Sequence, residues 1–324
     1  MNPEITVIVP YYNEKDSIEY TLERVGEQVL PATTAIFVNS SSSDDTPAVV
    51  DRWIRENQHR FSTRFVNLFE RTNNPASSKN VGIRHTKSAW LAFMDCGQNF
   101  EKTWLERQFA FAQDKRLDVV SGVVYAVGAN WVDRCAIAQT YGFRRNRPCV
   151  PTTLAKKSIF ERTGLFVEGR RAGYDIAWAI KLRKLGIERG VNETVKITYI
   201  GFNFSPNLAH LFRKSVMYAK PSVALEGYWM PYAYAIAPLL FALTAAASVA
   251  VAVALFVFYF LARTFIVPIM KARGIVFFRE HPWEALLGSG VVGLVIDLGK
   301  TVGTWQGIRS YYFSKSGAPE GQQP

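Results

Sequence analysis

A few charged side chains follow short apolar runs, and their types suit the binding of a phosphorylated ligand. Asp95 comes directly after the apolar run 90–94, which is typical of a buried strand. Open α/β sheets bind their ligands beyond the carboxyl ends of the strands, where Asp95 is then expected. A carboxylate at that point can meet either a metal ion or a sugar hydroxyl. We therefore take Asp95 as the centre of the expected site.

Asp175 is the second acid of interest. It lies at the start of an expected helix, 174–185, which Gly186 closes. An acid there can stabilise the helix macrodipole, or it can serve as a general base in a partly desolvated cleft. Both interpretations remain open on this residue alone.

Basic side chains offer partners for phosphate. Three arginines form a dense patch in an expected loop, and Arg213 lies in an expected helix near residues 208–218. Such residues are usually solvated, but they can also bind an acceptor phosphate or extend along a membrane surface. The three loop arginines are Arg144, Arg145 and Arg147.

Alternating strands and helices predict the framework that holds these residues. Over about the first hundred residues this pattern indicates a parallel sheet with helices on both faces. The segment 73–79 is expected as a polar loop, with a helix only over 81–87. Expected strands are 5–9, 35–38, 65–68, 90–94, 118–127, 149–154 and 195–200, and further helices begin near Asp16, Pro47 and Trp104.

Four motifs occur in an order that is similar to one enzyme family. They are Pro10-Tyr-Tyr-Asn-Glu14, the run 39–46, Ser78-Lys79-Asn80-Val-Gly82 and Phe93-Met-Asp95. Together they resemble the family 2 glycosyltransferases over roughly residues 4–220. The resemblance implies an α/β GT-A nucleotide-sugar-binding domain with a mostly parallel sheet. It also implies sugar transfer from a nucleotide donor with inversion.

The resemblance implies roles for several residues of the donor pocket. Pro10, Tyr12 and Glu14 would line the nucleoside site, and Asn39 stands where the family usually has an acid that contacts the base. Lys79 stands where a basic residue commonly contacts the nucleotide. An asparagine in place of an acid leaves the identity of the base open.

The same resemblance implies the residues of the reaction centre. Asp95 matches the first acid of the family's Asp-x-Asp motif, whereas Gly97 replaces the second acid, on which a divalent Mg²⁺ or Mn²⁺ mainly depends. Asp175 would be the general base, and His210 stands where relatives often have a histidine near the diphosphate or the metal. A divalent metal is therefore expected, but with only one carboxylate and the phosphates as ligands. Lys79 and the arginines could take the place of the metal.

Composition predicts a domain followed by membrane segments. The 324 residues carry a net charge of +11, and 48% of them are hydrophobic, with the apolar residues concentrated after residue 230. No zinc-ligand spacing or nucleic-acid motif occurs, so phosphates and anionic lipid are the better partners for this charge. Three scattered cysteines and a start that lacks a leader favour a cytosolic face at the inner or plasma membrane.

The expected division is a GT-A domain over 1–225, a membrane-associated helical region over 226–312 and a disordered tail over 313–324. The hydrophobic segments are about 232–262 and 284–307, each long enough to cross a bilayer. Glycines at four-residue spacing in the second segment would allow close helix packing. A hairpin, a double crossing before Met270, a re-entrant element and an interfacial second segment all remain open. The glycines are Gly299, Gly303 and Gly307.

The sequence therefore predicts a membrane-attached inverting glycosyltransferase. It would move one sugar from a nucleotide-sugar, with UDP as the expected nucleotide, to a lipid-linked acceptor glycan in cell-surface polysaccharide synthesis. One alternative is a polyprenyl-phosphate glycosyltransferase that makes a lipid-linked sugar donor. Another is an inactive membrane scaffold or nucleotide-sensing subunit, which Gly97 favours and Lys79, Asp95 and Asp175 oppose.

Overall fold

The computed structural model describes residues 3–140, 142, 144–145, 150–169, 172–199, 205–225, 227–272 and 275–313. By its internal contacts the chain forms two compact units. The first unit comprises residues 1–125 and 146–200, and the second comprises 126–145 and 201–324. The second unit thus takes a short segment from within the first 200 residues. The division at residue 225 expected from composition stays a prediction, and most of the expected tail, 314–324, lies outside the described residues.

The first unit is built on a mostly parallel sheet, as expected, with some antiparallel pairs. Its strand order is β3-β2-β1-β4-β8-β6-β9-β5. The first four of these strands are parallel, β8 is antiparallel to both of its neighbours, and β9 is parallel to β6. The strands are β1 (Ile5–Tyr11), β2 (Thr34–Asn39), β3 (Arg64–Phe69), β4 (Trp90–Phe93), β5 (Gln98–Asn99), β6 (Val119–Tyr125), β8 (Thr153–Lys156) and β9 (Gly190–Tyr199).

Helices cover both faces of this sheet because its central strands are apolar on both sides. Ile5, Val7 and Val9 of β1 belong to one apolar cluster, whereas Ile8 belongs to the cluster on the opposite face. The first face is covered by α1 (Ile18–Gly26), α2 (Thr46–Asn57) and α4 (Trp104–Asp114). The second is covered by α3 (Pro75–His85), α6 (Lys157–Thr163) and α7 (Tyr174–Lys184).

The position of α3 corrects the sequence expectation. The segment expected as a loop over 73–79 is helical from Pro75. Asn74 caps this helix, because its side-chain oxygen accepts hydrogen bonds from the backbone amides of Ala76 and Ser77. Pro75 occupies the first turn, where its lack of an N–H is tolerated. Lys79 therefore stands on a rigid helix.

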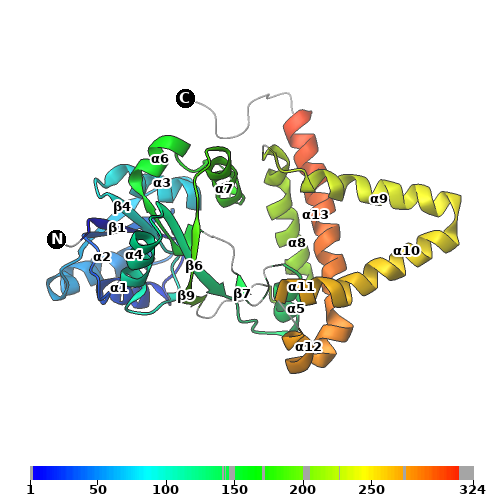
Figure 1. The fold of residues 1–324 in the computed structure, drawn as a ribbon, viewed down its shortest axis with the longest axis horizontal. Coiled ribbons are helices and arrows are strands. Elements are labelled where there is room, and N and C mark those ends of the chain that lie inside the picture. Colours follow the sequence, from blue (N-terminus) through cyan, green and yellow to red (C-terminus); the bar gives the residue numbers. More distant parts are fainter. Residues whose placement is uncertain are drawn as a thin grey trace. The chain divides into compact units, whose positions relative to one another are not determined.

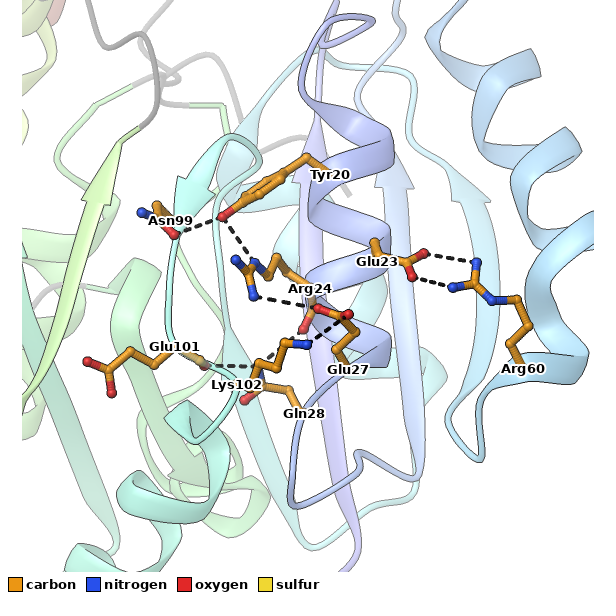
Figure 2. Close-up of polar contacts among 9 residues, drawn as sticks. All are labelled: Tyr20, Glu23, Arg24, Glu27, Gln28, Arg60, Asn99, Glu101 and Lys102. Carbon is orange, nitrogen blue, oxygen red and sulfur yellow. Dashed lines mark hydrogen bonds and ion pairs between the residues drawn. The ribbon is translucent and has the colours of Figure 1, made fainter.

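Polar contacts fix the segment that follows Asp95 against α1 (Figure 2). The Tyr20 hydroxyl donates to Asn99 Oδ1 at 2.8 Å, and Lys102 Nζ lies 3.0 Å from Glu27 Oε1. Gln28 Nε2 donates to the backbone oxygen of Glu101 at 3.1 Å. The chain is thereby tied, at Asn99 of β5 and just after it, to α1 and to the residues that follow α1.

The second unit is helical and includes a helix that the sequence analysis did not predict. This helix, α5 (Trp131–Gln139), packs with the C-terminal helices. Arg134 of α5 forms an ion pair with Glu284, with Nη2 and Oε1 2.5 Å apart. Further elements are α8 (Leu208–Ala219), α9 (Met230–Ala247), α10 (Val249–Leu261), a π-helical turn Ala262–Ile266, α11 (Val267–Ala272), α12 (Val276–Glu280), a second π-helical turn Glu284–Gly288 and α13 (Ser289–Tyr312).

Three helices are long and apolar enough to cross a membrane: Met230–Ala247, Val249–Lys271 and Glu284–Tyr312. The first expected hydrophobic segment thus contains two helices, a division that the double-crossing alternative allowed. The break lies at Ser248, which is extended (φ −158°, ψ 111°) and whose hydroxyl accepts from the amide of Val251, so that it caps α10. Figure 1 shows α9 and α10 running away from α13 and back toward it.

The glycine spacing of α13 serves close packing, as its pattern suggested, but the partner is α8. A Cβ atom at Gly303 would lie 2.3 Å from the backbone oxygen of Val216, and one at Gly299 would lie 2.8 Å from that of Phe212. Only glycine permits this approach of two helix backbones. One side of α13 is therefore covered by other parts of the second unit.

Candidate active site

The site centres on a lysine, an acid and a tyrosine from three elements. Lys79 of α3 donates from Nζ to Asp95 Oδ1 at 3.0 Å and to the Tyr174 hydroxyl at 3.3 Å. The Lys79 side chain is fully buried, whereas that of Asp95 is 31% exposed. Asp95 lies two residues beyond the end of β4, at the carboxyl end of the parallel strands, and Tyr174 begins α7. Lys79 thus connects the loop after β4 to the start of α7 by direct contacts.

The electrostatics keep this cluster charged as an ion pair. Burial alone would lower the pKa of Lys79, but the charge of Asp95 and the neighbouring Tyr174 outweigh it and raise that pKa. Burial raises the pKa of Tyr174 to about 12. At neutral pH, Lys79 is therefore an ammonium, and Tyr174 is a neutral phenol that accepts a hydrogen bond from it.

Asn80, the next residue of α3, holds the segment that leads into α7. Its Nδ2 donates to the backbone oxygen of Phe166 at 2.9 Å, and its Oδ1 accepts from the Phe166 amide at 3.0 Å. Nδ2 also contacts Glu168 Oε1 at 2.7 Å. In the sequence Asn80 follows Lys79. In the structure its hydrogen bonds hold Phe166 and Glu168, in the segment that precedes Tyr174 and Asp175.

The loop after Asp95 is fixed by one hydrogen bond within it and one to α1. The Asp95 amide donates to Gln98 Oε1 at 3.0 Å, and the Gly97 amide donates to Thr21 Oγ1 at 3.1 Å. Gly97 has φ 73°, a left-handed conformation that glycine adopts readily. Cys96 is buried beside Thr21 Oγ1, at 3.4 Å. The loop therefore presents Asp95 on a fixed backbone.

The residues expected to contact the nucleoside lie around the ends of β1 and β2. Pro10 is buried within β1, opposite Val38 of β2, and Tyr12 is 38% exposed just beyond that strand. Asn39 ends β2, and its Oδ1 accepts from the Ser42 amide at 2.8 Å, so this residue shapes the serine-rich loop. Their contact with a nucleoside stays a prediction.

Glu14 is held near Asp95. Its Oε2 accepts from the Ser17 hydroxyl at 2.5 Å, and its amide donates to Thr46 Oγ1 at 3.0 Å. Burial raises the pKa of Glu14, and the nearby charges of Asp95 and Asp44 add to the shift, against the effect of Ser17. Glu14 is therefore near enough to Asp95 for the two carboxylates to repel each other.

Asp175 follows Tyr174 in the first turn of α7 and is partly exposed. Its Oδ1 accepts from the Ile176 amide at 2.9 Å, as an acid at a helix start often does. The same carboxylate contributes to the electrostatic environment of the Tyr174 hydroxyl. Asp175 therefore lies beside the Lys79, Asp95 and Tyr174 cluster, and its role as a base stays a prediction.

Five expected site residues lie in the second unit or outside the described part of the chain. His210 and Arg213 are exposed on α8. Arg144 and Arg145 form the short strand β7, but their side chains lie outside the described residues, as does all of Arg147. Their proposed contacts with phosphate, acceptor or metal stay predictions.

The described residues do not fit a metal held by several protein ligands. Among them, no group of three or more His, Cys, Asp or Glu side chains is placed to hold a metal ion. Asp95 already pairs with Lys79, and Gly97 offers no side chain. Divalent cations of this kind prefer several oxygen ligands. We therefore derive no chemical step through a metal.

Sequence reasoning did not identify Tyr174 as the partner of Lys79, although it noted that Tyr174 replaces the usual glutamate. It also missed the serines that join α3 to the loop after β2, where the Ser40 and Ser78 hydroxyls are hydrogen-bonded. A surface hollow of about 710 Å³ lies between α4 and the start of β9. It is at the opposite end of the strands from Asp95, so it is no part of this site.

Comparison with known proteins agrees with this geometry. Residues 6–159 match the model of glycosyl transferase family 2. Glycosyltransferase AglE of Haloferax volcanii is 24% identical over 242 residues, which span 70% of this chain and 75% of AglE. The putative teichuronic acid biosynthesis glycosyltransferase TuaG of Bacillus subtilis is 29% identical over 115 residues, 35% of this chain and 43% of TuaG.

A solved structure shows the same fold over nearly the whole chain. It is the mannosyltransferase PcManGT from Pyrobaculum calidifontis, in complex with GDP-Man and Mn²⁺. The TM-score is 0.57 at 21% identity, and the match covers 93% of this chain and 87% of PcManGT. The region 6–159 of this chain thus belongs to glycosyl transferase family 2, and the chain has the GT-A fold of such glycosyltransferases.

Proposed function

We propose that this protein is a membrane-attached inverting glycosyltransferase of cell-surface glycan synthesis. It moves a single sugar from a nucleotide-sugar, a UDP-sugar in this proposal, to a lipid-linked acceptor glycan at the cytoplasmic face of the plasma or inner membrane. The observation that carries the proposal is the cluster of Lys79, Asp95 and Tyr174 at the carboxyl end of the sheet, with Asp175 beside it.

The proposed binding of a nucleotide-sugar donor rests on the position of Asp95 and Glu14. Asp95 and Glu14 lie near each other at the carboxyl ends of β1 and β4, the place where open α/β sheets bind nucleotides. The names of similar proteins support a sugar donor, because PcManGT is described with GDP-Man. Asn39 stands where an acid is usual and leaves the base open. Uracil as the base, and hence UDP as the nucleotide, is our proposal.

The transfer step needs one base. In the proposed step the acceptor hydroxyl oxygen attacks the anomeric carbon, the bond from that carbon to the phosphate oxygen breaks, and the nucleoside diphosphate leaves. Asp175 takes the hydroxyl proton as the new glycosidic bond forms, and attack from the face opposite the leaving group inverts the anomeric carbon. An acid at the exposed start of α7 can reach an acceptor that enters from solvent.

The acceptor half rests on the apolar helices. Three helices of the second unit are suited to a membrane by length and composition, and their side chains in α9 and α10 are largely exposed. Such helices would keep the enzyme beside a lipid-anchored substrate. The names AglE and TuaG belong to glycosyltransferases, and the latter is described for teichuronic acid biosynthesis.

The test is transfer of labelled sugar by the detergent-solubilised full chain. UDP-sugars and GDP-sugars are offered with a lipid extract of the host membrane, and label in the organic phase is measured. The anomeric configuration of the product is then read by NMR. We expect label in a glycolipid with an inverted linkage. Label on a polyprenyl phosphate would establish the alternative enzyme, and no turnover with any donor by folded protein would contradict the proposal.

A further inference from the structure

The positive charge that balances Asp95 is part of the protein. The Lys79 ammonium lies 3.0 Å from Asp95 Oδ1, and the lysine side chain is fully buried. Its second contact, the Tyr174 hydroxyl, is also supplied by the protein, at 3.3 Å. Lys79 stands on α3, which is capped by Asn74 and packed on the sheet, so the backbone that carries this ammonium is fixed.

The second acid of the usual metal motif is absent from a position that has room for it. A Cβ atom at Gly97 would meet Ser17 Oγ at 3.5 Å and Glu14 Oε2 at 3.9 Å, both ordinary contact distances. An acidic side chain here would point toward Glu14, beside Asp95. The chain therefore lacks the ligand at this position. No neighbouring atom blocks an acid there, although the left-handed backbone (φ 73°) would strain any side chain.

A divalent cation on Asp95 would also be repelled. It would bind the carboxylate that already holds the ammonium, so that three positive charges would lie within a few ångströms around one acid. In a partly buried place this repulsion is weakly screened.

From these contacts we infer that Lys79 is the resident cation of the donor site and that the protein binds its nucleoside diphosphate without a divalent metal. Tyr174 is the positioning residue that holds the ammonium on Asp95. The inference rests on the proposed function for the identity of the ligand. It differs from that function in what it claims, which is the absence of a metal requirement.

The first experiment distinguishes failure of the metal-free inference from failure of the proposed function. Mn²⁺ alone is titrated into the detergent-solubilised full chain and followed by electron paramagnetic resonance. UDP and GDP are titrated calorimetrically, in EDTA and again with Mn²⁺. We expect no saturable Mn²⁺ binding and nucleotide affinities that agree within about twofold in the two buffers. Saturable Mn²⁺ binding that Asp95→Asn abolishes would overturn the inference, as would nucleotide binding that Mn²⁺ tightens about tenfold or more.

If no nucleotide binds to folded protein, the proposed donor site is wrong, and the titration with Mn²⁺ alone still decides whether this acid holds a metal. Two variants sharpen that decision. Gly97→Asp adds the missing acid beside Glu14 and Asp95, and we expect it to gain saturable Mn²⁺ binding. Gly97→Asn is its uncharged control, with the same backbone requirement, and should bind none.

A third variant tests Lys79 itself. Lys79→Met keeps a long side chain in the buried place but removes the charge, so Asp95 becomes available to a divalent ion. We expect nucleotide binding by this variant to weaken in EDTA and to recover in part with Mn²⁺, a rescue that wild type does not show. Weakening that Mn²⁺ does not relieve, in Lys79→Met that melts as wild type does, together with no gain of Mn²⁺ binding in Gly97→Asp, would contradict the inference.

Discussion

The side-chain amide of Asn80 is paired with the backbone of Phe166, donating to its oxygen at 2.9 Å and accepting from its nitrogen at 3.0 Å. This double contact joins α3 to the segment that leads into α7. Lys79 on α3 and Tyr174 on α7 meet only if these two elements keep their relative position. The pairing therefore explains how residues 95 positions apart in the sequence stay in hydrogen-bond contact.

Replacing this asparagine should lower stability. Asn80→Ala leaves the buried backbone groups of Phe166 without their side-chain partners, and we expect a loss of about 2–4 kcal/mol in the free energy of unfolding. Thermal melting of the detergent-solubilised protein measures it. Arg84→Ala removes an exposed contact to Glu168, and should cost less than about 1 kcal/mol. Equal melting of both variants would show that the Asn80 pairing does not hold α7.

Asp175 should affect the rate and leave donor binding nearly unchanged. If it removes the acceptor proton, Asp175→Asn lowers kcat by about 10²–10⁴-fold, the range of general base catalysis. Steady-state transfer and calorimetric binding of UDP provide the two readouts. Glu161→Gln, at an exposed position on α6, is the matched acidic control. A variant that keeps its kcat would leave Asp175 a helix-stabilising residue and favour a phosphate acceptor, which has no proton to lose.

Stability should fall at alkaline pH through Cys96. Burial raises the pKa of this thiol from 9.0 to about 12. The folded state thus prefers the neutral thiol, so its contribution is complete below pH 9 and is lost as the pH rises from about 9 to 12. We expect the melting temperature to decline over that window and Cys96→Ala to flatten part of the decline. Below pH 8.5 the two proteins should respond to pH in parallel; a separation there would contradict the assignment.

A methyl group on α13 should disturb its contact with α8. Gly303→Ala would place a Cβ 2.3 Å from the backbone oxygen of Val216 and 2.9 Å from Ala219 Cβ. Although alanine is the better helix former, we expect a loss of about 1–3 kcal/mol, because the two helices must separate. Limited proteolysis and melting in detergent report it. Val302→Ala, on the exposed side of α13, should change stability by less than about 0.5 kcal/mol. A more stable Gly303→Ala would refute the close approach.

The sequence predicted those parts of the fold that local patterns determine. The apolar runs before Asp95 and Pro10 became β4 and β1, and the ordered motifs led to the family and its sheet. The start of α3 was missed because a run of polar residues was given more weight than the cap and proline that begin it. The placement of Tyr174 on Lys79 depends on long-range packing through Asn80, which no local pattern records.

The membrane region shows the same limit. Composition located the apolar segments, but the break at Ser248 depends on a single capping hydroxyl within a continuous apolar run. Likewise, α5 was missed because its buried residues are distributed around the helix. Its polar side chains are used inside the second unit, where Gln139 Nε2 donates to the backbone oxygens of Arg263 and Ser289 at 2.5 and 3.0 Å.

The packing of α5 with α8 and α13 limits where this protein could be shortened to make it soluble without detergent. A chain cut at residue 225 would keep α5 and α8 but lose α13, and would expose the surfaces of Val132 and Leu211 that now pack in one cluster with Val292 and Ile296. Such a fragment would aggregate. The part that can be redesigned is the outer portion of α9 and α10, whose apolar side chains contact little else. Polar substitutions there, with α13 retained, are the route to a soluble protein.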